Sequence, residues 1–129
     1  MLLIDTSVWI EVFRRRDPLD LQAVAAISEW VTCLQVVQEV LRGFRDERAF
    51  GAARESMLAI PMVESPLRRE VFLEAASLYR AARREGLTVR SGVDCLIAVC
   101  ALRNDLEVLH RGRDFDALAR VSALRSRTA

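Results

Sequence analysis

Acidic residues follow two apolar runs that have the length and composition of buried strands. Asp5 comes directly after "LLI" (residues 2–4), and Asp114 and Asp116 follow "LEVL" (106–109) after a short loop. If these two strands run parallel, the carboxylates lie at the same edge of a sheet, where open α/β proteins gather their ligands. The sequence therefore predicts an acidic site at that edge.

Two further acids are expected beside it. Glu39 lies in the first turns of a helix that follows "VTCL" (31–34), and Asp94 lies in the first turn of a helix that follows the loop at Gly86. Carboxylates that converge without a cation repel one another and raise one another's pKa values. A hard divalent cation removes that conflict, and oxygen ligands favour Mg²⁺ or Mn²⁺ over zinc. Ions held in this way activate water for phosphodiester hydrolysis.

Each acid also has a structural interpretation. Asp5 can interact with the N-terminus of the helix after it, with Thr6 as the cap. Ser91 and Asp94 have the S-x-x-D form of a capping box. The other acids have interpretations of the same kind, Glu39 as a solvated helix-face charge, Asp114 as an N-cap and Asp116 as a first-turn acid favoured by the helix dipole. Only their joint placement favours a cation site.

Strand-like and helix-like segments alternate along the chain. This alternation predicts one α/β domain over residues 1–129, with a mainly parallel sheet of four to five strands and helices on both faces. Strands are expected at 2–4, 31–34, 60–65 and 106–109, with an edge strand near 121–126. Helices are expected at 7–15, 21–30, 36–46, 47–59, 66–86, 91–105 and 114–121.

The composition narrows the function classes. All 19 basic residues are arginine, which excludes lysine Schiff bases and a P-loop. Cys33, Cys95 and Cys100 form no C-x-x-C pair and are expected to be buried reduced thiols, and the single histidine disfavours a zinc site. A net charge of +1 argues against a broadly basic nucleic-acid surface. With no membrane-length apolar run and no basic leader, we expect a cytoplasmic protein without membrane segments.

Four segments carry a family resemblance. In order, "MLLIDTSVWIEVF", "QEVLRG", "TVRSGVDCLIAVCALRND" and "LEVLHRGRDFDALAR" resemble a PIN-domain ribonuclease of the VapC toxin type. The resemblance spans nearly the whole chain and implies a PIN-like nuclease that cuts RNA with Mg²⁺ or Mn²⁺. It also implies restraint by a cognate VapB-type antitoxin and a homodimer. Matched by position, the family's catalytic acids fall on Asp5, Glu39, Asp94 and Asp114, with Thr6 and Ser7 beside the first.

The chain departs from the family at Gly112. The last family motif is H-x-D-x-D-F or T-x-D-x-D-F, and its first aspartate falls on this glycine. We therefore expect Asp5 and Asp94 to hold a first ion, with Glu39 binding it directly or through water. By the resemblance, the acids of the last motif support a second ion, and this position is weakened because Gly112 leaves Asp114 to act with Asp94. Gly112 can alternatively be a loop glycine that provides a positive φ angle.

Residues near the acids are candidates for binding RNA, because guanidinium groups pair with phosphates in a bidentate manner. We expect Arg90, Arg111 and Arg113, together with Thr6 and Ser7, to contact the substrate. Each of these arginines is otherwise a solvated surface charge. Apolar side chains of the first helices are candidates for the core, an antitoxin groove or a dimer face, namely Trp9, Val12, Phe13 and Trp30.

Three functions remain open at this point. The first is a metal-dependent endoribonuclease toxin, with activity reduced by Gly112. The second is a PIN-fold protein that binds antitoxin or RNA without efficient turnover. The third is a phosphoacceptor domain built around Asp5, which the absence of lysine and the order of the elements disfavour.

Overall fold

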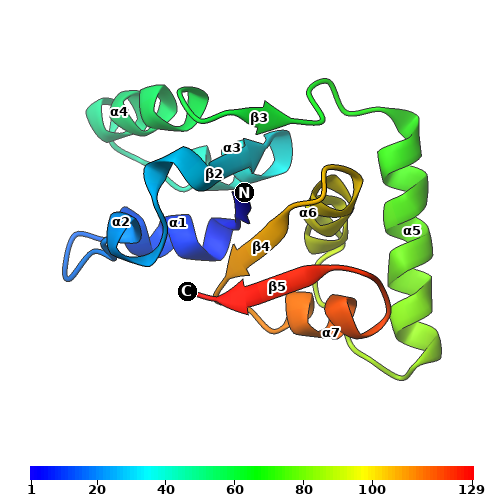
Figure 1. Ribbon diagram of the computed structural model, residues 1–129. Helices are drawn as coiled ribbons and strands as arrows, with labels where there is room; N and C mark the ends of the chain where they lie inside the picture. Colours follow the sequence, from blue (N-terminus) through cyan, green and yellow to red (C-terminus); the bar gives the residue numbers. More distant parts are fainter.

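A five-stranded parallel sheet forms the centre of the molecule (Figure 1). The computed structural model describes residues 1–129, and the strand order is β3-β2-β1-β4-β5. The strands are β1 (Leu2–Ile4), β2 (Trp30–Cys33), β3 (Met62–Val63), β4 (Glu107–His110) and β5 (Arg125–Thr128). The predicted α/β fold with four to five parallel strands is confirmed, and the edge strand lies slightly later than expected.

Helices flank this sheet in two groups. Helices α1 and α4 each pack against α3, while α5, α6 and α7 form a second group that contacts the first through α6 and α3. The helices are α1 (Thr6–Val12), α2 (Leu21–Val24), α3 (Leu34–Leu41), α4 (Glu47–Leu58), α5 (Arg69–Arg84), α6 (Gly92–Arg103) and α7 (Asp114–Arg120), with a 3-10 turn η1 at Ile27–Glu29. No helix is both long and apolar enough to span a bilayer.

The prediction of one helix over 21–30 is wrong for the second half of this segment. The backbone turns extended at Ala25 and Ala26, so α2 stops after one turn and η1 follows. The Trp30 indole donates to the carbonyl of Ala25 at 3.1 Å, and Glu29 accepts from the Ala26 amide at 3.2 Å. These local bonds replace helical ones, and Trp30 begins β2 instead of ending a helix.

One apolar core binds the layers together. It contains all of β1, the inward residues of β2 and β4, and most of α6, which is buried along nearly its whole length. The three cysteines are free and buried, as predicted. Helix α3 ends at Leu41, earlier than expected, and Phe44 packs on the core from the turn that follows.

The strand register brings the candidate acids to one edge. In the parallel pairing of β1 with β4, Ile4 lies opposite Leu109. The Asp5 amide then donates to the Leu109 carbonyl at 2.9 Å, so the chain leaves both strands at the same level. Both β1 and β2 pass directly into helices, which places Asp5 and the start of α3 at that same edge.

Candidate active site

Asp5 serves two purposes with its two oxygens. Its Oδ2 atom caps α1, accepting the Ser7 amide at 3.0 Å and the Ser7 hydroxyl at 2.5 Å. The cap is therefore Asp5 itself, and Thr6 is the first residue of the helix. The Oδ1 atom of Asp5 is buried and has no hydrogen-bond partner. A buried carboxylate oxygen left unpaired is costly, and a ligand at this point would relieve that cost.

Glu39 is tied to α1 rather than exposed to solvent. The buried Thr6 hydroxyl donates to Glu39 Oε1 at 2.8 Å, which joins two residues that are far apart in the sequence. Arg42, one turn further along α3, lies 3.9 Å from Glu39 Oε2. The interpretation of Glu39 as a freely solvated helix-face charge is wrong, because the Thr6 bond directs its carboxylate toward the N-terminus of α1.

The side chain of Asp94 does not cap the N-terminus of α6. Ser91 accepts the Asp94 amide at 3.4 Å, which forms one half of the expected capping box. The other half is absent, because the Ser91 amide donates instead to Asp114 Oδ2 at 3.1 Å. The carboxylate of Asp94 is consequently free to take part in the acidic site.

Asp114 connects α7 to the loop before α6. Its Oδ2 atom accepts the amides of Arg90 and Ser91 at 3.0 and 3.1 Å. The N-cap of α7 is Arg113, so the expectation that Asp114 caps this helix is wrong. Asp114 is buried, whereas Asp116 is largely exposed and points toward His110.

The electrostatics of the cluster converge on Asp94. The pKa of Asp94 is raised to about 8, first by its burial and then by the charge of Asp5, a hydrogen bond with Asp114 and the charges of Asp114 and Glu39. The other three acids predicted from the sequence thus all act on Asp94. A carboxyl group with such a pKa holds its proton at neutral pH unless a cation displaces it.

The acidic residues have the ligand chemistry for a hard divalent cation, but their side chains do not form a complete coordination site. No three His, Cys, Asp or Glu side chains converge closely enough to hold an ion in the arrangement seen. The donor chemistry nevertheless suits such an ion, since all donors are carboxylates and the unpaired Oδ1 of Asp5 belongs to the cluster. The cluster is an acidic site that a cation would neutralise and draw together.

Gly112 borders a polar pocket beside these acids. Its φ angle is not positive, so the interpretation of a glycine required by backbone conformation is wrong. A Cβ atom at this position would meet no other atom within 4 Å. The pocket has a volume of about 320 Å³ and is lined by Arg90, Asp94, Gly112, Arg113 and Asp114, with no apolar residue.

The three candidate arginines differ in their partners. Arg111 lies 3.7 Å from Glu11, which also binds Arg14 at 2.6 Å, and these arginines hold the pKa of Glu11 below its usual value. Arg90 and Arg113 are exposed and form no ion pair, although both line a pocket that contains two aspartates.

His110 has a role that sequence reasoning missed. Its ring is buried, and Nδ1 accepts the Gly112 amide at 3.2 Å, which fixes the loop between β4 and α7. Nε2 lies 3.4 Å from Asp116 Oδ1 but without the geometry of a hydrogen bond. The available signal was the position of His110 two residues before Gly112, a spacing at which a side chain can accept the later backbone amide.

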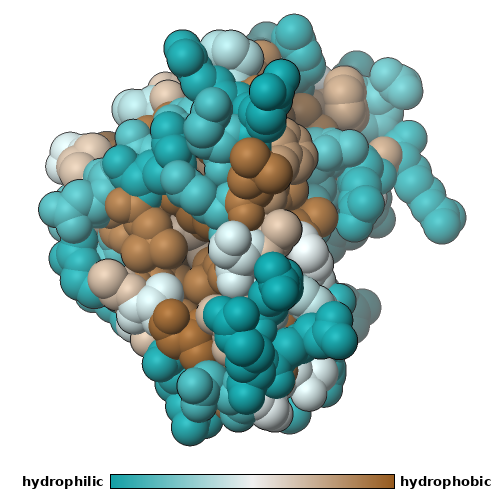
Figure 2. All heavy atoms as spheres, turned by 90° about the vertical axis from the view of Figure 1, so that its right-hand side faces the viewer, coloured by the Kyte–Doolittle hydropathy of each residue, from teal (hydrophilic) through white to brown (hydrophobic).

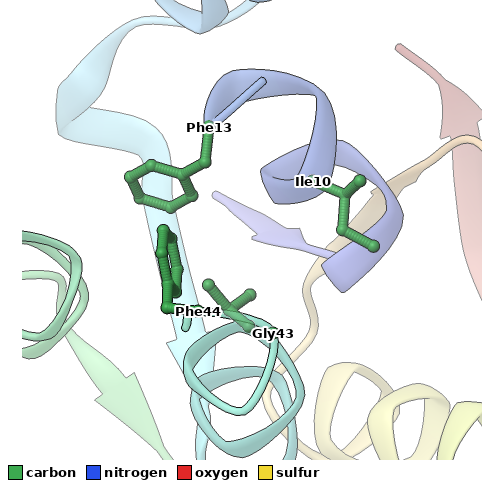
Figure 3. A pocket seen from close by; sticks show the side chains of 5 residues that line it. Ile10, Phe13, Gly43 and Phe44 are labelled. Atoms are coloured by element: carbon green, nitrogen blue, oxygen red, sulfur yellow. The ribbon is translucent and has the colours of Figure 1, made fainter. Parts of the chain in front are cut away.

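An apolar trough lies on the other side of α1. Ile10 of α1 and Phe13, which directly follows this helix, face Gly43 and Phe44 after α3, around a pocket of about 180 Å³ (Figure 3). Phe13 also lines a second pocket of about 420 Å³. Of the aromatic candidates, Trp9 is part of the core and Trp30 is partly buried, and both line this second pocket together with Val12.

Comparisons with known proteins agree with this architecture. Residues 2–121 match the family model of the PIN domain. Ribonuclease VapC11 of Mycobacterium tuberculosis is 35% identical over 131 residues, which cover 98% of this chain and 97% of the relative. The VapBC-5 toxin-antitoxin structure from the same species has a TM-score of 0.73 at 21% identity, covering 98% of this chain and 97% of that chain.

A second solved structure has the same fold. VapBC-1 from nontypeable Haemophilus influenzae has a TM-score of 0.75 at 14% identity, covering 98% of this chain and 96% of that chain. At these identities the solved structures support the fold, while the curated relative and the family model support the family. The chain therefore belongs to the PIN domain family and, within it, to the VapC ribonucleases.

Proposed function

We propose that this protein is a toxin of a toxin-antitoxin system, an endoribonuclease that hydrolyses RNA phosphodiester bonds with Mg²⁺ or Mn²⁺. The observation that carries the proposal is the convergence of three acids, Asp5, Glu39 and Asp114, on Asp94, whose pKa is raised to about 8. Such a group of mutually repelling carboxylates is destabilising unless a cation occupies it. The similarity to VapC11, a ribonuclease, supports RNA as the substrate.

In this proposal Asp5, Asp94 and Asp114 hold the cation. When bound, the ion supplies charge neutralisation for the phosphate and favours ionisation of an attacking water. Asp5 offers its buried Oδ1 atom, while Ser7 keeps its other oxygen in place. Asp114 is held by the backbone of Arg90 and Ser91, which aligns the start of α6 with that of α7.

Glu39 orients the attacking water. The Thr6 hydroxyl fixes Oε1 and leaves Oε2 available, with the Arg42 guanidinium at 3.9 Å. Thr6 and Ser7 thus act through the acids that they bind, in addition to the substrate contacts predicted from the sequence. Arg90, Arg111 and Arg113 remain the candidates for contacting RNA phosphates.

Gly112 leaves the cation site one carboxylate short of the family motif. With fewer ligands we expect weaker cation binding and slower cleavage than in a relative that has an acid at this position. The alternative function, antitoxin or RNA binding without efficient turnover, is favoured by the same glycine and by the lack of a preassembled group of three ligands. RNA digestion distinguishes the two.

The trough beside α1 is our candidate for the antitoxin site. It exposes Ile10 and Ile27 to solvent, at 58% and 62%. Val40 and Gly43, which line its smaller pocket, lie within about one helical turn of Glu39. A peptide seated there reaches the edge of the acidic site and can block it, which is how we propose that a VapB-type antitoxin neutralises this toxin.

The exposed face of α5 is our candidate for a homodimer interface. Phe72 and Leu73 are 49% and 61% exposed, and apolar side chains gather among polar ones on this side of the molecule (Figure 2). Two shallow pockets of about 460 and 230 Å³ flank these residues. A second copy of the chain would cover this surface. Because RNA and antitoxin are intracellular molecules, we place this activity in the cytoplasm.

Digestion of total RNA tests the proposed function. The wild type should cut RNA when Mn²⁺ is present and should not cut it in EDTA. Asp5→Asn should abolish cleavage while the circular dichroism spectrum stays unchanged. Asp105→Asn is the matched control, because Asp105 is exposed and remote from the cluster, and it should cut like the wild type. Equal cleavage by the Asp5 and Asp105 variants would disprove the assignment, and absence of cleavage by the wild type would favour the binding-only alternative.

A further inference from the structure

The pocket at Gly112 contains positive groups with no partner in the protein. Arg90 and Arg113 line it and form no ion pair, whereas Arg111, whose amide donates to the Ser7 hydroxyl, is paired with Glu11. Both pocket arginines are exposed, so their guanidinium groups are available to a ligand. Two unpaired arginines beside an acidic cluster indicate a site for an anion.

Asp114 fixes the positions from which both arginines extend. It accepts the backbone amide of Arg90 at 3.0 Å, and Arg113 precedes it in the chain. His110 completes the frame by accepting the Gly112 amide at 3.2 Å. The backbone on both sides of the pocket is thus held by buried polar groups, and only the arginine side chains remain free to adjust.

The glycine determines what the pocket can hold. A side chain at position 112 would start in open space, because its Cβ would meet nothing within 4 Å. An aspartate there would bring a negative charge to the same pocket and would pair with the two arginines. Glycine leaves both the volume of about 320 Å³ and the guanidinium groups unoccupied.

We infer that the pocket lined by Arg90, Gly112 and Arg113 is a phosphate subsite, in which an RNA phosphate occupies the place that a carboxylate at position 112 would take. This inference rests on the proposed function, since it concerns how the same site holds RNA. The pocket lies next to Asp94 and Asp114, so a phosphate bound there adjoins the acidic cluster. Gly112 thereby leaves the space beside the two arginines open to the substrate's phosphate.

Binding of RNA without cleavage provides the test. The probe is a fluorescein-labelled single-stranded RNA of mixed sequence, titrated in EDTA so that no hydrolysis occurs, at several salt concentrations. Each phosphate contact contributes about 0.7 to the slope of log affinity against log salt for single strands. Arg90→Gln and Arg113→Gln should each weaken binding several-fold and lower that slope by about 0.7. Arg120→Gln is the matched control, because Arg120 is exposed, unpaired and at the far end of α7, and its slope should fall by less.

Variants at position 112 separate charge from volume. Gly112→Asp should weaken RNA binding in EDTA at least tenfold, and adding Arg113→Gln to it should cost little more, because the aspartate already occupies that arginine. Gly112→Asn has the same shape without the charge and should weaken binding much less. Circular dichroism and thermal melting check that each variant is folded.

Two outcomes would overturn the inference. One is a wild-type affinity and slope for Arg90→Gln and Arg113→Gln, or values equal to those of Arg120→Gln. The other is equal binding by wild type and Gly112→Asp. Cleavage in Mn²⁺ that is lost in Asp5→Asn is a separate measurement, so the proposed function would stand even if the phosphate subsite failed.

Discussion

At the scale of single residues, three of the four acids of the cluster share one arrangement. Each is held through one oxygen: Asp5 by Ser7, Glu39 by Thr6, and Asp114 by the backbone amides of residues 90 and 91. The remaining oxygens are left to a ligand. Asp94 accepts no such bond from a hydroxyl or a backbone amide. Its protonation equilibrium is shifted instead, because burial and the other three acids raise its pKa.

This equilibrium makes stability depend on pH when no metal is bound. The pKa of Asp94 is raised from its usual value of 3.8 to about 8, so between these pH values the folded protein binds a proton that the unfolded chain has released. The stabilisation of the folded state by this proton is complete below about pH 4 and is lost as pH rises toward 8. In EDTA, Asp94→Asn should therefore match the wild type near pH 4 and exceed it at pH 8.5. The expected gain is about 2 to 4 kcal/mol once solvent screening of this partly exposed group is included.

Urea unfolding followed by circular dichroism at both pH values measures this difference. Asp105→Asn serves as the control, because Asp105 is exposed and its pair with Arg125 contributes little. A constant difference between wild type and Asp94→Asn across this pH range would contradict the proposed coupling.

A second prediction at this scale concerns Gly112. Gly112→Asp adds a carboxylate beside the cluster without backbone strain, because the φ angle is not positive and the space is open. Mn²⁺ should bind more tightly, and kcat at saturating RNA should rise about 30-fold to 1000-fold if the second ion position contributes 2 to 4 kcal/mol. Gly112→Asn is the control and should leave both quantities near the wild type. Unchanged Mn²⁺ affinity and kcat in Gly112→Asp would mean that Asp114 or Asp116 already fills this role.

At the scale of the elements, the first turn of α1 connects the site to α3. The bond from Thr6 to Glu39 joins the two helices at the sheet edge. Thr6→Val keeps the shape and removes the donor, so Glu39 loses its orientation. We expect kcat for RNA cleavage in Mn²⁺ to fall about 10-fold to 100-fold, the equivalent of a hydrogen bond to a charged group. Thr6→Ser retains the hydroxyl and should cleave much faster than Thr6→Val, whereas equal rates for the two variants would exclude this positioning role.

Sequence periodicity was sufficient for most elements and failed where local side-chain bonds compete. The strands at 2–4 and 106–110 and the helices near 47–58 and 114–120 agree with expectation within a residue or two. The helix expected at 21–30 breaks because the Trp30 indole and Glu29 carboxylate bind the backbone at Ala25 and Ala26. Apolar periodicity contains no information about such bonds.

The sequence was sufficient to predict which acids lie together in the site. It was not sufficient to predict the hydrogen-bond partners of each acid. Strand ends and parallel pairing place Asp5 and Asp114 at one edge, and that follows from the order of the elements. The half-formed capping box at Ser91 could not be predicted from the sequence. It arises because the Ser91 amide donates to Asp114, which is distant in the sequence. The partnership of Arg111 with Glu11 and the conformation of Gly112 also arise only in the folded chain.

At the scale of the whole molecule, two apolar surfaces are exposed outside the acidic site. One is the trough beside α1, and the other is the face of α5 with Phe72 and Leu73 (Figure 2). If the α5 face forms the homodimer, sedimentation velocity at micromolar concentration should show a dimer for the wild type and a monomer for Leu73→Glu. Leu58→Glu is the matched control, because Leu58 is 50% exposed on α4, and it should remain dimeric. A monomeric wild type, or a dimer that survives Leu73→Glu, would contradict this assignment.

Calorimetric titration of the metal-free protein with Mn²⁺ at pH 7, in two buffers of different ionisation enthalpy, tests the central claim that the acidic cluster is a cation site. Because the pKa of Asp94 is about 8, this carboxyl is mostly protonated before the ion binds and must ionise to hold it. The account predicts release of roughly 0.9 proton per ion bound by the wild type. Asp94→Asn should show weak binding and no proton release. Mn²⁺ binding that releases no proton, or that is the same in Asp94→Asn, would contradict the account.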